Sequence, residues 1–306
     1  MTQSKLIAVT GGSGFVGTHV VDALLSAGHE VRVIDQVAPR QSEVDWVKTD
    51  ILDEEGLTRA FDDVGPVFHL AAMADVNDVV ENPDGAVAAN ILGTSRILKA
   101  AQRAEAGRVF LSSTVWVYSG APEPVVDEAT PLDLMAERHL YASTKIAAEM
   151  LCRDHRTLYG RPYTILRYGI PFGPYMRDRL VIAAFIKRAM RGEPLRIDGD
   201  GRQERTFIYV EDLARAHALA LVPAAENRTY NLEANEAVSI RQLAELVGEL
   251  VGNTEVSFGD ARAGDFKAVR IKADRAREEL GWEPKVSFRE GLERTLAWYR
   301  AEANKA

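Results

Sequence analysis

The chain has 306 residues, a hydrophobic content of 46% and one cysteine, Cys152. Its formal net charge of -8 argues against nucleic acid or an anionic membrane surface as a general partner, because both are polyanions. One cysteine cannot form an intrachain disulfide and no apolar run approaches the ~18 residues of a membrane span, so we expect a globular cytoplasmic protein with Cys152 as a buried thiol.

Short β-rich runs alternate with longer segments of helical periodicity from residue 5 to about residue 167. This alternation predicts an α/β fold of the Rossmann type, in which a doubly wound parallel sheet is covered by helices on both faces. The predicted strands are residues 5–10, 31–35, 45–49, 66–70, 108–112 and 163–167. The predicted helices between them are residues 15–27, 54–61, 83–104 and 140–159.

The composition of the chain changes after Arg167, where Gly-Pro-rich turns interrupt short secondary-structure elements. This change predicts a smaller C-terminal α/β domain that binds the substrate, comprising about residues 169–204 and 234–306. The remaining residues, 1–168 and about 205–233, would form the larger Rossmann domain, because the chain returns to it at about residues 207–232. Helices are predicted near residues 239–251, 273–280 and 287–302.

A glycine-rich turn at Gly11, Gly12, Gly14 and Gly17 follows the first predicted strand. Strand, glycine turn and helix start together are typical of a dinucleotide site, since they bring backbone N–H groups and the positive end of a helix to a pyrophosphate. Asp35 closes the second strand, where its carboxylate would accept hydrogen bonds from both ribose hydroxyls of NAD. The same carboxylate would repel the 2′-phosphate of NADP, and Gln36 offers no cation to compensate, which disfavours an NADPH-consuming reductase.

Tyr141 and Lys145 are four residues apart in a predicted helix, so both side chains project from one face. A phenol has a pKa near ~10, but a nearby ammonium group and the positive nicotinamide ring would favour the phenolate. Tyr141 could then take a proton from a sugar hydroxyl as hydride passes to NAD. Thr114 follows the fifth strand, whose carboxyl end faces the ligand crevice, so its hydroxyl can help hold the reacting oxygen. We predict this trio as the catalytic centre, the alternative being capping hydroxyls and a solvated pair.

The glycine turn and the trio are accompanied by further motifs along almost the whole chain. They are residues 50–53 (Asp-Ile-Leu-Asp), 69–72 (His-Leu-Ala-Ala), 90–94 (Asn-Ile-Leu-Gly-Thr), 201–212, 262–265 (Arg-Ala-Gly-Asp) and 280–284 (Leu-Gly-Trp-Glu-Pro). With these motifs the chain resembles the extended short-chain dehydrogenases/reductases of the NAD-dependent epimerase/dehydratase family. Within that family it is most similar to nucleotide-sugar 4-epimerases of the UDP-galactose type.

The resemblance implies a set of ligand contacts. The residues that it places around NAD are Gly11, Gly14, Phe15, Val16, Gly17, Asp35, Asp50, Ile51, Leu70, Ala71, Ala72, Asn90, Ser112, Tyr141, Lys145 and Tyr168. Those that it places around the nucleotide-diphosphate sugar are Thr114, Ile170, Arg205 and Arg262. Ile170 departs from the family pattern, because an asparagine that contacts the diphosphate usually stands there.

The residues after Thr114 bear on the reaction. The resemblance implies that sugar 4,6-dehydratases carry Asp-Glu directly after the catalytic threonine, and that UDP-glucuronate decarboxylases carry a glutamate two residues after it. Val115 and Trp116 occupy these positions and cannot transfer a proton. We therefore expect a 4-epimerase of a UDP-hexose that works through a 4-keto intermediate and keeps NAD tightly bound. A dehydratase, a decarboxylase, another NAD-dependent sugar oxidoreductase and a non-catalytic dinucleotide sensor remain alternatives.

The resemblance also implies a homodimer, in which helices 83–104 and 140–159 pack against the partner's copies as a four-helix bundle. The apolar positions that would serve this interface, or else face their own sheet, are Ala88, Ile91, Leu92, Leu98, Ile146, Ala147, Met150 and Leu151. We expect neither a metal ion nor nucleic acid nor a membrane as a further partner.

Overall fold

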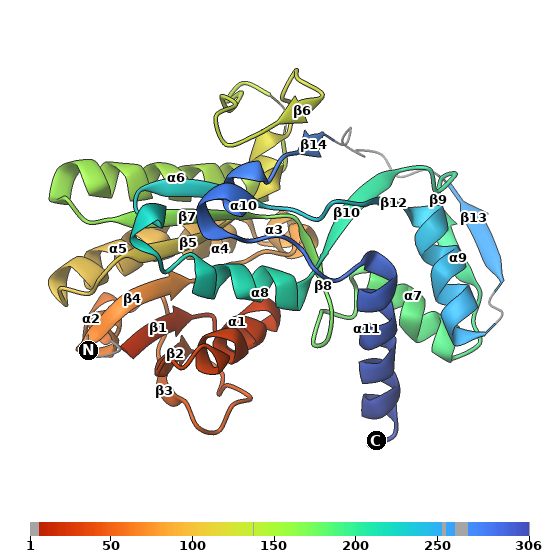
Figure 1. The fold of residues 1–306 in the computed structure, drawn as a ribbon, viewed down its shortest axis with the longest axis horizontal. Helices are drawn as coiled ribbons and strands as arrows, with labels where there is room; N and C mark the ends of the chain where they lie inside the picture. Colours follow the sequence, from red (N-terminus) through yellow and green to blue (C-terminus); the bar gives the residue numbers. More distant parts are fainter. Residues whose placement is uncertain (1–5, 137, 253–254, 261–268, 306) are drawn as a thin grey trace.

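A computed structural model describes residues 6–136, 138–252, 255–260 and 269–305. At its centre lies a seven-stranded parallel sheet with the order β11-β7-β5-β4-β1-β2-β3 (Figure 1). The strands are β1 (Leu6–Thr10), β2 (Val31–Asp35), β3 (Asp45–Lys48), β4 (Val64–His69), β5 (Val109–Thr114), β7 (Tyr163–Tyr168) and β11 (Arg228–Leu232). The strand order reverses between β1 and β4, which opens a crevice at their carboxyl ends. The predicted doubly wound sheet is confirmed.

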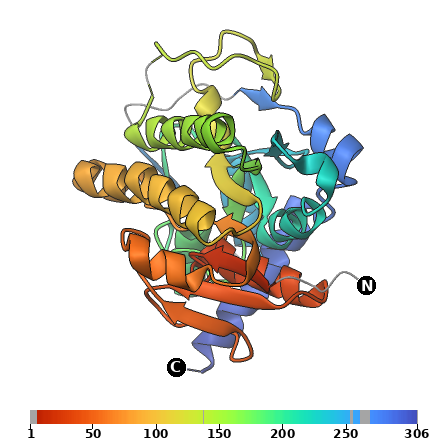
Figure 2. The same cartoon turned by 90° about the vertical axis from the view of Figure 1, so that its left-hand side faces the viewer.

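Helices cover both faces of the sheet. On one face lie α1 (Phe15–Ser26), α8 (Val210–Leu219) and α10 (Asp274–Leu280), and on the other lie α2 (Glu54–Ala60), α5 (Gly93–Arg103) and α6 (Leu140–Tyr159). Figure 2 shows α5 and α6 side by side on one side of the sheet and α8 and α10 on the other. Neighbouring residues of a strand point to opposite faces, so Val9 packs in the first core and Ala8 in the second.

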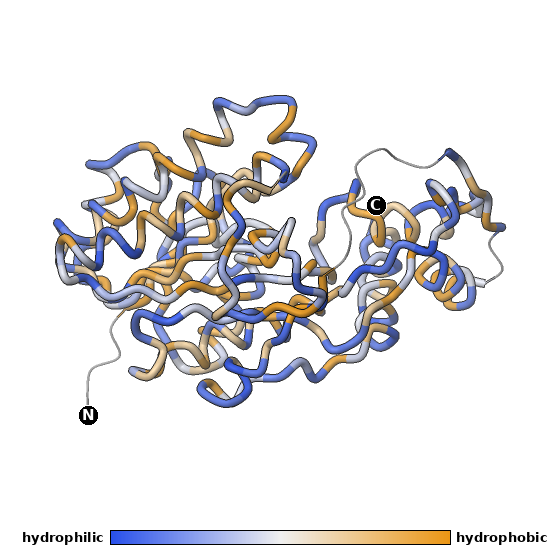
Figure 3. Tube along the Cα trace, turned by 90° about the horizontal axis from the view of Figure 1, so that it is seen from above, coloured by the Kyte–Doolittle hydropathy of each residue, from blue (hydrophilic) through white to orange (hydrophobic). Residues whose placement is uncertain are grey.

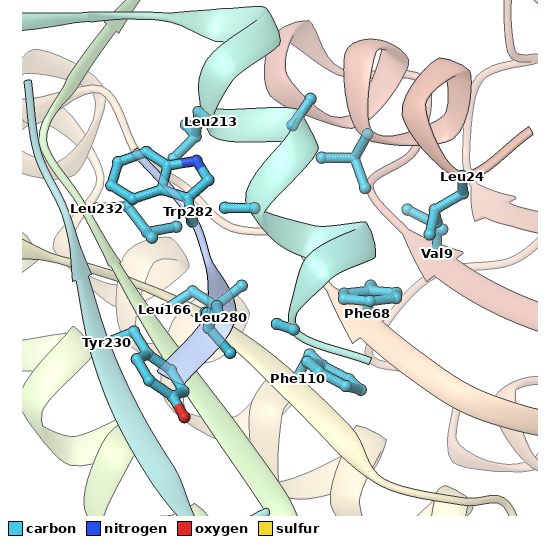
Figure 4. Close-up of a cluster of buried hydrophobic side chains, with 14 of the residues drawn as sticks. Val9, Leu24, Phe68, Phe110, Leu166, Leu213, Tyr230, Leu232, Leu280 and Trp282 are labelled. Carbon is cyan, nitrogen blue, oxygen red and sulfur yellow. The ribbon is translucent and has the colours of Figure 1, made fainter. Parts of the chain in front are cut away.

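The core under α1 and α8 is closed by residues that come from the far end of the chain (Figure 4). Trp282 is 1% exposed, and its indole Nε1 donates a hydrogen bond to the Asp212 carbonyl oxygen at 2.8 Å. Leu280 packs in the same cluster with Tyr230 and Leu232 of β11. Apolar residues gather along the segments that run through the middle of the molecule, whereas many outer turns are hydrophilic (Figure 3).

A second group of elements forms the smaller part of the molecule. A three-stranded sheet consists of β12 (Ala237–Ser239), β10 (Glu204–Tyr209) and β8 (Ile170–Phe172), and a two-stranded sheet of β13 (Val256–Gly259) and β9 (Leu195–Asp198). The helices α7 (Val181–Met190), α9 (Ile240–Val251) and α11 (Phe288–Ala303) pack on these strands around a separate core. A further pair joins β14 (Arg270–Ile271) to β6 (Val125–Val126). The domain boundaries given above stay a prediction.

The predicted helix over residues 83–104 is interrupted. It consists of α4 (Pro83–Val87), one turn of π-helix, η1 (Ala88–Leu92), and α5, and a short additional helix, α3 (Val76–Glu81), precedes it. π turns are wider than α turns and often occur at functional sites. In the part of the chain that the structure describes, no helix combines the length and the apolar character needed to cross a bilayer.

Two residues expected at a helix interface lie inside the chain's own cores. Leu98 is 4% exposed and packs beneath α5, and Ile146 is 6% exposed and packs against Val117 and Tyr118. Leu98 faces inward because it lies on the face of α5 that covers the central sheet, whereas Ile146 lies on the face of α6 that covers residues 115–118. Leu92 and Met150, by contrast, are exposed on the outer side.

Candidate active site

A cleft of about 1800 Å³ lies at the carboxyl ends of the central strands. Because a typical small-ligand pocket measures ~300–1,000 Å³, this cleft has room for two ligands. The predicted residues that line it are Gly11, Gly14, Phe15, Val16, Gly17, Asp35, Asp50, Ile51, Leu70, Ala71, Ala72, Ser112, Thr114, Tyr141, Lys145, Tyr168, Ile170 and Arg205. Asn90 is placed behind this lining, and Arg262 lies outside the described residues.

The glycine turn between β1 and α1 is closely packed. Gly11 has a φ of +73°, and a Cβ atom added to it would lie 2.5 Å from the Ala71 backbone nitrogen. A Cβ at Gly17 would lie 2.0 Å from the Gly11 carbonyl oxygen. The N-cap of α1 is Gly14, which has no side chain to cap the helix, so backbone N–H groups face the cleft as they would for a bound pyrophosphate. This part of the cleft fits a dinucleotide.

Asp35 ends β2 with its carboxylate fixed by two backbone donors. Oδ2 accepts from Ser13 N–H at 3.1 Å and Oδ1 accepts from Val37 N–H at 3.2 Å. Each carboxylate oxygen can accept a second hydrogen bond, so both remain able to receive a ribose hydroxyl. Gln36, the next residue, donates to Asp50 at 3.2 Å rather than offering a charge. This arrangement fits the adenosine ribose of NAD and disfavours a 2′-phosphate.

The Asn90 side chain joins three segments of the chain behind the cleft. Its Oδ1 accepts from Met73 N–H at 2.8 Å, and its Nδ2 donates to the Met73 carbonyl oxygen and to Thr144 Oγ1, both at 3.0 Å. Both amide hydrogens and one lone pair are therefore used within the protein. The side chain links the π turn to the segment after β4 and to α6, and a direct contact to NAD stays a prediction.

Tyr141 and Lys145 reach the cleft from the first turns of α6. Burial lowers the pKa of Lys145 to about 8, and it raises the pKa of Tyr141 to about 12, against the opposing charge of Arg177. Burial of the phenol outweighs the charge of Arg177, and the phenolate expected from Lys145 together with an oxidised nicotinamide ring stays a prediction. Tyr141 carries its proton at neutral pH until a bound cation, such as an oxidised nicotinamide ring, favours the phenolate.

Thr114 ends β5 and caps η2 (Val115–Tyr118). Its Oγ1 accepts from Trp116 N–H at 3.2 Å, which leaves the hydroxyl hydrogen to donate to an oxygen in the cleft. Val115 is buried, and the Trp116 ring rests on His139, the N-cap residue of α6, with 4.3 Å between ring centroids. Val115 and Trp116, the two residues after Thr114, thus form part of the cleft wall and provide no acidic or basic side chain.

Ser112 is joined to the interior by a relay of hydrogen bonds. The Tyr168 hydroxyl lies 2.6 Å from Ser112 Oγ and 2.5 Å from His217 Nε2, and His217 Nδ1 lies 3.0 Å from the Leu213 carbonyl oxygen. A carbonyl oxygen can only accept, so we assign the proton of His217 to Nδ1, which makes Nε2 the acceptor from Tyr168. Burial lowers the pKa of His217 to about 4, so the ring stays neutral. Ser112 then donates to Tyr168 and presents its lone pairs to the cleft.

A buried ion pair supports the floor of the site. Both carboxylate oxygens of Glu149 accept from Arg167, at 2.8 and 2.7 Å, and Oε1 also accepts from Ser113 at 2.7 Å. Arg167 donates further to the Tyr118 hydroxyl at 2.5 Å. Glu149 lies one turn after Lys145 on α6, so the network joins α6 to β5 and β7. Sequence reasoning missed this network, for which the signal was a charged residue inside the apolar strand β7.

Two arginines that sequence reasoning also missed line the cleft from the loop before α7. Arg179 Nη2 lies 2.9 Å from Asp78 Oδ1, and Arg177 Nη1 lies 3.7 Å from Asp75 Oδ2. These ion pairs join that loop to α3 and its N-cap Asp75. Among the described residues, no group of three or more His, Cys, Asp or Glu side chains is arranged to hold a metal ion.

Comparison with known proteins places these features in a family. The NAD dependent epimerase/dehydratase family matches residues 7–232. The structure of UDP-glucose 4-epimerase from Thermotoga maritima with UDP-glucose is similar, with 33% identity, a TM-score of 0.90 and coverage of 97% of this chain and 99% of that one. UDP-glucose 4-epimerase from Thermus thermophilus in complex with NAD has 32% identity, a TM-score of 0.87 and coverage of 96% and 99%. UDP-glucuronic acid decarboxylase 1 from Xenopus tropicalis is 34% identical, covering 97% of this chain and 73% of the relative.

Proposed function

Because the chain belongs to the NAD-dependent epimerase/dehydratase family, we propose that it is a 4-epimerase of a UDP-hexose, of the UDP-glucose/UDP-galactose type. The observation that carries this proposal is the meeting of Tyr141, Lys145 and Thr114 in one cleft with a dinucleotide turn, while Val115 and Trp116 stand beside Thr114. Such a site can remove and return a proton at one sugar hydroxyl. It does not add an acid or base next to Thr114, where elimination would require one.

The chain's own groups have distinct tasks in this reaction. Tyr141 accepts the proton of the sugar 4-hydroxyl, and Thr114 donates a hydrogen bond to the same oxygen. Lys145 holds the nicotinamide ribose and adds positive charge near the phenol. When bound, NAD supplies the hydride acceptor and donor, so it is regenerated in each cycle and should stay on the protein. The released proton returns from Tyr141 after the 4-keto sugar has turned over in the cleft.

The nucleotide would lie on the other side of the cleft. Arg205 lines the cleft from β10, where a guanidinium can bind phosphate oxygens with two parallel hydrogen bonds. Ile170 on β8 lies in the lining too, but its side chain is apolar and cannot donate to a phosphate. We therefore propose that the diphosphate depends on Arg205 and Arg262 rather than on residue 170.

A panel of UDP-, GDP-, dTDP- and CDP-sugars, incubated with the pure protein without added NAD, tests the proposal. We expect NMR to detect the 4-epimer of a UDP-hexose, because NAD stays bound from expression onward. A 4-keto-6-deoxy product would identify a dehydratase instead, and a pentose product from UDP-glucuronate would identify a decarboxylase. Absence of any product from a protein that contains NAD would favour a dinucleotide sensor.

We also propose that two copies associate through η1, α5 and α6. Leu92 and Met150 are 44% and 50% exposed on the outer side of these helices, while Ile91, Ala147 and Leu151 are partly buried beside them. Covering these apolar side chains with a second copy would remove them from water. Analytical ultracentrifugation at micromolar concentration should give a species of twice the chain mass, and a monomer alone would contradict the dimer.

A further inference from the structure

A carboxyl group that the mechanism does not use lies in the cleft wall at Glu233. Glu233 directly follows β11, the strand at the edge of the central sheet, and is 5% exposed although it lines the cleft. The Gly169 backbone N–H donates to the Leu232 carbonyl oxygen at 2.9 Å, which ties the ends of β7 and β11 together. Glu233 therefore lies beside the point where the chain leaves β7 for β8.

Gly169 provides the space for this carboxyl group. A Cβ atom at Gly169 would lie 2.2 Å from Glu233 Oε1 and 2.7 Å from its Cδ. Any residue with a side chain at position 169 would have to displace the carboxyl group, so its present position depends on a glycine there. The carboxyl group is thus held in a defined slot of the cleft wall.

The slot offers little to stabilise a negative charge. Within the described residues, the Ala234 backbone N–H donates to Glu233 Oε1 at 3.1 Å, and the ion pairs of Arg177 and Arg179, which also line the cleft, are made with Asp75 and Asp78. Burial raises the pKa of Glu233 to about 8 against the effect of that one hydrogen bond. At neutral pH the group is therefore a carboxylic acid with a proton to donate.

The position of Glu233 favours the nucleotide-sugar over NAD. Asp35 and the glycine turn lie at β2 and β1, whereas β11 is at the opposite edge of the sheet. The segment after Glu233 leads into β12, where Val238 pairs with Arg205. The titratable groups on neighbouring elements that also line the cleft are Tyr168, Glu204, Arg205, Arg270, Lys272, Asp274, Arg277 and Glu283.

We propose that Glu233 binds the nucleotide-sugar as a neutral carboxylic acid, donating its proton in a hydrogen bond to a phosphate or sugar oxygen. The inference rests on the proposed function, because it assumes a nucleotide-sugar in this half of the cleft. Ionisation of Glu233 would replace a donor with a negative charge beside an anionic ligand. Binding therefore takes the protonated form and weakens as the pH rises through about 8.

Titration calorimetry with UDP and with UDP-glucose on the NAD-containing protein tests this assignment. Above the pKa of Glu233, the affinity of the wild type for UDP-glucose, and for UDP as well if the acceptor is a phosphate oxygen, should fall by about tenfold per pH unit, and binding should take up a proton from the buffer. Glu233→Gln keeps a neutral donor of similar shape, so between pH 7 and pH 9 its affinity should depend much less on pH than that of the wild type, and its binding should lack the proton uptake that is due to Glu233. The matched control is Glu236→Gln, an exposed glutamate of the same segment, which should behave like the wild type.

Comparing UDP with UDP-glucose identifies the ligand oxygen that accepts the hydrogen bond. It also distinguishes failure of the role of Glu233 from failure of the proposed function. If UDP and UDP-glucose both bind with proton uptake, the acceptor is a phosphate oxygen, and if only UDP-glucose does, it is a sugar oxygen. The same pH dependence and proton uptake in the wild type and in Glu233→Gln would overturn the role of Glu233 while leaving the proposed function standing. No binding of either ligand to the wild type at pH 7 would overturn both.

Discussion

Replacing Tyr141 with phenylalanine is expected to lower kcat by about 10²–10⁴-fold while NAD stays bound. The variant removes the one hydroxyl that we assign to accept the sugar proton and keeps the ring that fills this part of the cleft. Because this interaction strengthens in the transition state, KM should change much less than kcat. The measurements are the rate of UDP-galactose conversion followed by NMR and the NAD content released on denaturation.

The same helix supplies a matched control for this prediction. Tyr159 lies at the last turn of α6, is 53% exposed and contacts His155 by its ring, far along the helix from the cleft. Tyr159→Phe should keep the wild-type rate and NAD content. Turnover at the wild-type rate by Tyr141→Phe would mean that another group accepts the proton. Loss of NAD together with activity would assign Tyr141 to cofactor binding instead.

Local patterns were sufficient to predict six of the seven strands of the central sheet, all except β11, and most of its helices. β2 and α6 have the expected bounds, because an apolar run closed by Asp35 and an amphipathic segment closed by Gly160 are strong local signals. The parallel order also follows from the alternation of strands and helices. The π turn at Ala88–Leu92 could not be predicted in this way, because the contact that its Asn90 makes with Met73 joins residues 17 apart in the sequence.

The candidate site likewise contains residues that the sequence alone indicates and residues that only the fold brings together. The glycine turn, Asp35 and the Tyr141–Lys145 pair have fixed spacings in the chain, so the sequence alone indicated them. Contacts between residues that are far apart in the sequence have no characteristic spacing, so they could not be predicted. Arg177 and Glu233 are charged residues that a sequence places on a surface by default, and only the fold brings them to the cleft wall. The burial that raises the pKa of Tyr141 could not be predicted from a spacing of four residues either.

Arg167→Met is expected to lower the free energy of unfolding by about 3–5 kcal/mol. The substitution leaves Glu149 buried, with its carboxylate deprived of the two charge-assisted hydrogen bonds from the guanidinium. Arg153 contacts the same carboxylate at 3.0 Å but is 40% exposed, so Arg153→Met should cost only about 0–1 kcal/mol. Urea denaturation of the three proteins at pH 7 compares these values.

The pH dependence of the loss separates this ion pair from a simple packing defect. Burial alone would raise the pKa of Glu149, but the hydrogen bonds and charge of Arg167, with Ser113 and Arg153, hold it below its usual value of 4.5. A lowered pKa in the folded state stabilises the protein above the pKa of the unfolded chain, and this contribution disappears as the pH falls through the folded pKa. Without Arg167 the buried carboxyl group can protonate readily, so the difference between variant and wild type should narrow as the pH falls from 7 to below 4.5. A loss that is equal at pH 7 and at acid pH would instead point to packing alone, and would contradict the view that this charge pair holds α6 against β7 beneath the candidate catalytic centre.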